Sequence, residues 1–126
     1  MRILGTTLFL SGLLWTSAAA AVSCSVPHFH FVDGGTTPAQ MFTGPGTPCA
    51  FYFKISEFGR GDAGILSSRV TTRPKYGVLG HSSVRLYAYQ PAAGYTGTDL
   101  FEVDIRYDRS GKMLARTMQV QVNISN

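Results

Sequence analysis

The sequence lacks the residue clusters on which most enzymes depend. We find no nucleophile beside a base, no pair of carboxylates in an apolar stretch and no glycine-rich loop that could cradle a phosphate. Apart from residues 3–15, no apolar run approaches the ~20 residues that a membrane span requires. We therefore expect neither an enzyme nor a membrane-spanning protein, and nothing in the sequence indicates a cofactor.

Charged residues are also few. The chain has 11 Lys and Arg residues against 7 Asp and Glu residues, which gives a formal net charge of +4. The basic residues are scattered along the chain, except that Arg69, Arg73 and Lys75 fall near one predicted strand end. We expect these residues to form an ordinary solvated face, with a site for anionic glycans or phosphates as the alternative. Nothing in this modest, scattered charge indicates a nucleic-acid partner.

The N-terminus has the pattern of a secretory signal peptide over residues 1–21. Arg2 supplies a positive start, the following run to Trp15 is largely apolar, and cleavage is predicted near Ala20 or Ala21. The protein is therefore expected in the periplasm or outside the cell. Loss of Arg2 leaves ten basic residues against seven acidic ones, a net charge of +3, on one domain of about 105 residues.

Cysteine is limited to Cys24 and Cys49, in a chain predicted to reach an oxidising compartment. A disulfide between them is the simplest interpretation, and closing that loop would contribute about 3 kcal/mol in the chain-entropy model. The alternative is lipid attachment at Cys24. Residues 22–49 are predicted to contain an edge strand over 26–32 and then a loop over 36–47, where proline and glycine break regular structure.

Residues 50–126 alternate between apolar and polar side chains with period two. The clearest cases are 101–105, whose odd-numbered residues should face a core, and 117–124, whose even-numbered residues should do the same. Short strands are predicted over 50–55, 65–72, 76–79, 83–89, 100–106 and 117–124, with a hairpin turn at 108–112. This pattern predicts an all-β, immunoglobulin-like antiparallel β-sandwich of about seven strands, although periodicity alone leaves a β-barrel open.

One motif carries a family resemblance. The run Tyr89-x-Pro-x-x-Gly-Tyr-x-Gly-x-Asp-x-Phe101, preceded by residues 73–78, resembles the bacterial cadherin-like and immunoglobulin-like tandem-repeat domains of surface and secreted proteins. The likeness covers about residues 50–124 and departs where those domains usually have Pro-x-His-Gly-Thr. It implies a β-sandwich and no single activity. Cadherin-like domains often bind calcium between repeats, but here the acidic residues of 99–108 are expected to form ordinary surface pairs, and Asp99 to cap its turn.

The predicted function is that of an exported, non-enzymatic binding or structural module, expected as a monomer, whose partner is a protein or an envelope glycan. Aromatic and basic residues carry much interface energy, so the predicted binding patch comprises Arg73, Lys75, Tyr76, Arg85 and Tyr87. An inhibitor of another enzyme would suit the same small domain. The alternative from another class is a periplasmic copper or zinc protein that uses His28 and His30. An Arg-Gly-Asp triplet at 60–62 is expected to be an ordinary turn.

Overall fold

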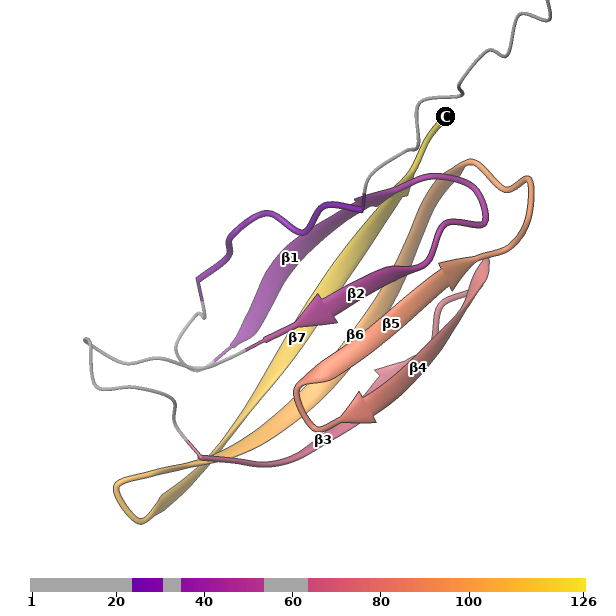
Figure 1. Cartoon of the computed structure of the whole chain (residues 1–126). Coiled ribbons are helices and arrows are strands. Elements are labelled where there is room, and N and C mark those ends of the chain that lie inside the picture. Colours follow the sequence, from indigo (N-terminus) through magenta and orange to yellow (C-terminus); the bar gives the residue numbers. More distant parts are fainter. Residues whose placement is uncertain (1–23, 31–34, 54–63) are drawn as a thin grey trace, which may run out of the picture.

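The computed structural model describes residues 24–30, 35–53 and 64–126, and these residues form two β-sheets packed against each other (Figure 1). The larger sheet has the strand order β1-β7-β6-β3, and the smaller has the order β2-β5-β4. Their bounds are β1 Thr36–Thr43, β2 Cys49–Tyr52, β3 Gly64–Thr72, β4 Gly77–Ser83, β5 Leu86–Pro91, β6 Gly97–Arg109 and β7 Lys112–Ile124. Across these ranges no helix is long and apolar enough to cross a membrane. The all-β prediction is confirmed.

The β6–β7 hairpin is the largest element, with 13 residues in each strand. Its register runs from Gly97 opposite Ile124 to Arg109 opposite Lys112. The predicted alternation is confirmed, because Phe101, Val103 and Ile105 and the even-numbered residues from 118 to 124 are all buried. Ser110 and Gly111 both have positive φ values, 51° and 81°, as a two-residue hairpin turn of type I′ requires.

Aromatic rings fill the space between the sheets. Phe51 of β2 meets Phe101 of β6 edge-on, with ring centroids 6.3 Å apart, while Tyr89 of β5 stacks on Phe101 at 6.1 Å. All three rings are fully buried. Because one aromatic side chain removes about 150–250 Å² from water, these contacts between sheets are a main source of the stability of the fold.

The N-terminal region contradicts one prediction, because residues 36–43 form strand β1 where the sequence predicted a loop. β1 pairs in parallel with β7 along its whole length, from Thr36 opposite Thr117 to Thr43 opposite Ile124. Its residues alternate strictly between exposed and buried, and Pro38 is tolerated because β1 lies at the edge of its sheet. A strand was predicted over 26–32, but its described residues, 26–30, are coil. The residue before them, Ser25, forms a single β-bridge with Phe42 of β1.

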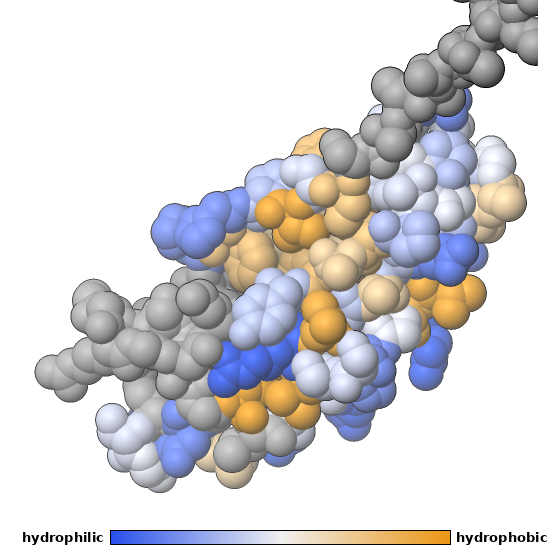
Figure 2. Space-filling view, viewed as in Figure 1, coloured by the Kyte–Doolittle hydropathy of each residue, from blue (hydrophilic) through white to orange (hydrophobic). Residues whose placement is uncertain are grey.

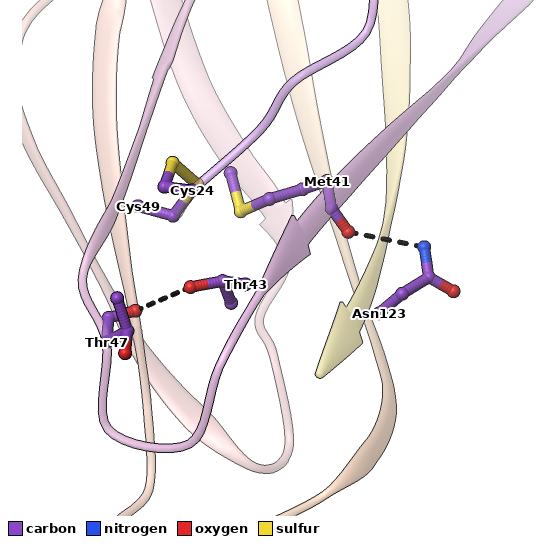
Figure 3. Close-up of a disulfide and its surroundings, with 6 residues drawn as sticks. All are labelled: Cys24, Met41, Thr43, Thr47, Cys49 and Asn123. Atoms are coloured by element: carbon purple, nitrogen blue, oxygen red, sulfur yellow. Dashed lines mark hydrogen bonds between the residues drawn. A yellow bond between two sulfur atoms is a disulfide. The ribbon is translucent and has the colours of Figure 1, made fainter. Parts of the chain in front are cut away.

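The predicted disulfide between Cys24 and Cys49 is present, with 5.3 Å between the two Cα atoms. Figure 3 shows it next to Met41 of β1, so it ties the N-terminal segment to β2. Because the sulfur of Cys24 is bonded to Cys49, it is not available for lipid attachment. The predicted signal peptide, the last two residues of the strand predicted over 50–55 and the Arg-Gly-Asp triplet lie outside the described residues.

The strands predicted over 76–79 and 83–89 correspond to β4 and β5, which form a hairpin. Gly77 lies opposite Pro91, and Ser83 lies opposite Leu86, with one register shift between His81 and Ser83. β4 is the last strand of its sheet, so only one of its edges is paired.

Candidate functional site

Three of the five predicted binding residues lie together. Arg73, Lys75 and Tyr76 belong to the connection between β3 and β4, and they line a surface groove of about 420 Å³. The rest of the groove comes from the end of β3, the start of β6 and Gln121 of β7. We call this the cationic groove. Its members come from strands that are neighbours in the larger sheet, so folding places them side by side.

Tyr87 contradicts the prediction that it belongs to an exposed patch. Its side chain is 1% exposed, and its hydroxyl forms a 2.7 Å hydrogen bond with the hydroxyl of Ser68. Tyr87 and Tyr89 are two residues apart on β5, so both point toward the core. The tyrosine pattern alone did not show which face of this strand is buried.

Arg85 does not join the groove either. It precedes β5 at the hairpin end where Ser83 opposes Leu86, whereas Tyr76 precedes β4 at the end where Gly77 opposes Pro91. At about 3.3 Å per residue, the length of β4 places these two residues roughly 20 Å apart. The predicted five-residue patch is therefore reduced to its three members at the groove.

Asp99 holds the groove in shape. The residue is 6% exposed, and its carboxylate accepts four hydrogen bonds of 2.7–2.9 Å. The donors are the backbone N–H groups of Lys75, Tyr76 and Leu100 and the hydroxyl of Tyr89. The sequence predicted that Asp99 caps its own turn, but three of its four donors belong to other segments. Two of these three donors, the N–H groups of Lys75 and Tyr76, belong to residues that line the groove.

The pKa values of this buried pair move in opposite directions. Burial raises the pKa of Asp99, but the hydrogen bonds from Tyr89 and the three backbone N–H groups lower it more, so the pKa lies below the ordinary 3.8. Burial, followed by the hydrogen bond to Asp99, raises the pKa of Tyr89 well above its ordinary value of 10.0. At neutral pH the pair is therefore a carboxylate and a neutral phenol. Because four donors already occupy the carboxylate, we assign it a structural role.

An aromatic pair forms the rim of the groove. The rings of Tyr76 and Tyr95 stack with centroids 4.3 Å apart and planes 9° apart. The hydroxyl of Tyr95 donates a hydrogen bond to the backbone oxygen of Thr98, which also lines the groove. Tyr76 is still 46% exposed. The rim therefore offers an aromatic surface whose position is set by a second ring.

The two cations of the groove are exposed and have no ion pair or side-chain hydrogen bond within the described part of the chain. Arg73 and Lys75 are on the same connection, separated only by Pro74. These two positive charges beside an exposed tyrosine suit an anionic, polar ligand. One guanidinium group can donate two parallel hydrogen bonds to two oxygens of a carboxylate, sulfate or phosphate.

For the alternative of a copper or zinc site, the structure places only His28 and His30 close together. The rings of His28 and His30 lie edge to face with centroids 5.1 Å apart, and both residues are exposed. Among the described residues, no group of three or more His, Cys, Asp or Glu side chains could hold a metal ion. Two acidic side chains of β6 have neutral partners, since Glu102 accepts hydrogen bonds from Thr72 and Gln119 and Asp104 accepts one from Thr117.

No protein-family model and no curated protein matches this sequence. Among solved structures, the chain is similar to an endo-fucoidan hydrolase from glycoside hydrolase family 107 and to a variant of it. The variant gives a TM-score of 0.43 at 9% identity, and the other structure gives 0.39 at 8%. The match covers 78% of this chain and only 15% of each hydrolase chain. A likeness at this level carries no inference about activity.

Proposed function

We propose that this protein is an exported, non-enzymatic binding module that holds an anionic group of its partner in the cationic groove. One observation carries the proposal: Arg73 and Lys75, which have no side-chain partner among the described residues, lie beside the exposed Tyr76 on one connection. Asp99 holds the backbone of that connection in place by accepting hydrogen bonds from the N–H groups of Lys75 and Tyr76. A groove held in shape before its ligand arrives loses less conformational freedom on binding.

We further propose that the fold is immunoglobulin-like. In that fold one sheet contains the third, sixth and seventh strands, and the other contains the second, fifth and fourth. The observed orders β7-β6-β3 and β2-β5-β4 agree with this arrangement. The first strand here joins β7 in parallel rather than the second strand. Such sandwiches serve many proteins as scaffolds for binding surfaces, and function is decided by the site.

A binding role suits the groove better than catalysis. The one carboxylate in its lining, Asp99, is occupied by four donors, and the remaining side chains are two cations, Tyr76, two threonines, Leu100 and Gln121. This set offers hydrogen bonds and charge to an anion but no base or nucleophile with an activating neighbour. The anionic group can come from an acidic envelope glycan or from an acidic segment of a protein.

The test compares ligand panels across two matched double variants. Arg73→Ala with Lys75→Ala removes the groove cations, while Arg106→Ala with Lys112→Ala removes the same charge from exposed positions elsewhere. Binding of acidic and neutral polysaccharides and of acidic peptides is measured by calorimetry. Because a charged hydrogen bond contributes about 1.5–3 kcal/mol, the groove variant should bind its ligand at least tenfold more weakly. If both double variants lost the same affinity, the loss would come from the lower net charge and not from the groove, which would contradict the proposal.

A further inference from the structure

The outer edge of β4 is the least protected strand edge in the described structure. Four strands lie at sheet edges, namely β1, β3, β2 and β4. Unpaired edges attract other strands, and proteins usually block them with proline, charge, bulges or short length. Figure 1 shows β4 at the rim of the smaller sheet, with β5 as its only paired neighbour.

The other three edges each have such a device. β1 contains Pro38, and its Phe42 exchanges two backbone hydrogen bonds with Ser25 of the N-terminal segment. β3 carries the exposed Arg69 and has two shifts in its register with β6. β2 is only four residues long. β4 has seven residues, no proline and no Lys, Arg, Asp or Glu. Its one register shift with β5, between His81 and Ser83, follows a regular stretch from Gly77 to His81.

The register also shows which backbone groups of β4 are unpaired. The N–H of Ala92 donates to the oxygen of Tyr76, so position 76 is hydrogen-bonded to the strand beside it. Hydrogen-bonded and non-hydrogen-bonded pairs alternate along an antiparallel ladder. Val78 and Gly80 therefore also bond toward β5. The N–H and C=O groups of Gly77, Leu79 and His81 then point away from β5, to the open edge.

We propose that a second copy of this chain binds here, with β4 of each copy pairing antiparallel about a two-fold axis at Leu79. This register places Leu79 opposite its counterpart and Gly77 opposite His81 of the other copy. All six outward N–H groups of the two strands then donate to outward carbonyl groups, since each such pair exchanges two hydrogen bonds. The result is one continuous six-stranded sheet. This assembly departs from the monomer expected from the sequence.

The side chains of β4 are self-complementary in this register. On the core-facing side, Leu79 meets its own counterpart, and the ring of His81 lies opposite a glycine. On the outer face, Val78, which is 74% exposed, lies opposite Gly80. A bulky side chain therefore meets a glycine or a like apolar residue at each position. Because the strand carries no Lys, Arg, Asp or Glu, two identical copies meet without like-charge repulsion.

The outer face of the smaller sheet also favours a second copy of this chain as the partner of β4. Across this face, exposed residues include Ala88 and Gln90 of β5, opposite Gly80 and Val78, and Ala50 and Tyr52 of β2 beyond them, none of them charged. Figure 2, viewed as in Figure 1, shows tan and orange residues on the middle of this side, with blue, hydrophilic residues beside them. A second sheet can continue this surface without bringing charge beside it. The surface adjoins the cationic groove where Gly77 follows Tyr76, but no groove residue belongs to β4. This inference therefore does not rest on the proposed function.

The first test measures molar mass by light scattering and sedimentation from about 10 µM to 1 mM. Val78→Lys places two like charges diagonally across the two-fold axis, about 7–8 Å apart. Gln90→Lys is the matched control, because Gln90 lies directly opposite Val78 on β5 and is also exposed, but is one strand away from the edge. We expect the wild type and the Gln90 variant to double in mass, and the Val78 variant to associate at least tenfold more weakly.

Hydrogen exchange provides the second measurement. Amides of Gly77, Leu79 and His81 should exchange at least tenfold more slowly in the concentrated wild type than in the Val78→Lys variant, whose circular dichroism should be unchanged. Monomeric mass at every concentration would overturn the proposal. A dimer in which these three amides stay unprotected would also overturn it. The same holds if β4 pairs only with an added peptide of another sequence and not with a second copy of this chain.

Discussion

Asp99 is the residue whose replacement tests the structural argument most directly. In Asp99→Asn, one oxygen that accepts hydrogen bonds is replaced by an NH₂ group, which cannot accept them. Oδ1 accepts from the N–H groups of Lys75 and Leu100, and Oδ2 accepts from the N–H of Tyr76 and the hydroxyl of Tyr89. The Tyr89 hydroxyl can rotate to accept from the new NH₂, but the backbone N–H beside it cannot.

The expected loss follows from these bonds. At least one backbone N–H loses its acceptor, which costs about 1–3 kcal/mol. The bonds that remain lose the assistance of the charge, worth about 1 kcal/mol each. Because three of the four bonds are only partly buried, we expect Asp99→Asn to lower the free energy of unfolding by about 2–4 kcal/mol. That is a large share of the about 5–15 kcal/mol of a small domain.

The same substitution should change the pH dependence. The folded-state pKa of Asp99 lies below its ordinary 3.8, so the unfolded chain binds this proton more readily. Stability from this group is therefore present above pH ~4 and is lost as the pH falls through the folded-state pKa. The stability gap between wild type and Asp99→Asn should narrow as the pH falls below 4.

Urea denaturation followed by circular dichroism measures both effects. Asp108→Asn is the control, because Asp108 lies on the same strand β6 and is exposed, and its side chain has no hydrogen bond within the described residues. It should change the free energy of unfolding by less than about 0.5 kcal/mol. If Asp99→Asn is as stable as the control, or if its deficit is the same at pH 7 and pH 3, the carboxylate does not anchor the groove as described.

Two further predictions concern β4 and the histidine pair. A Cβ atom at Gly77 would lie 2.6 Å from both the oxygen of Gln90 and the hydroxyl of Tyr89, whereas one at Gly80 would meet nothing within 4 Å. Gly77→Ala should therefore lower the free energy of unfolding by about 1–3 kcal/mol and Gly80→Ala by much less; equal urea midpoints would refute this. For a binding module, native mass spectrometry should show a metal-free chain with or without alanine at positions 28 and 30. Copper or zinc that disappears in the double alanine variant would favour the metal alternative.

Much of the fold could be predicted from local pattern. The strands around Phe101 and Val120 were predicted because alternation with period two is visible in a few consecutive residues. The turn at Ser110 and Gly111 was predicted for the same reason, since its φ angles depend on the residues in it. The disulfide followed from there being only two cysteines, Cys24 and Cys49.

The candidate site was predicted only where its members are close in sequence. Arg73, Lys75 and Tyr76 come together because one short connection carries them all. Tyr87 was misplaced because alternation shows that two faces exist without showing which one is buried. Asp99 was noticed as a cap, but no sequence pattern links it to residues 24 positions earlier.

What the sequence determined by itself is the all-β character, the long hairpin and the cysteine pair, each set by residues that act over a few positions or by count. The tertiary structure alone decided that residues 36–43 form a strand, because that strand is stabilised by its parallel pairing with β7, some 80 residues away. It also decided that Asp99 supports the cationic groove. Pairings over such distances depend on how all the strands share one core, and no local pattern records that choice.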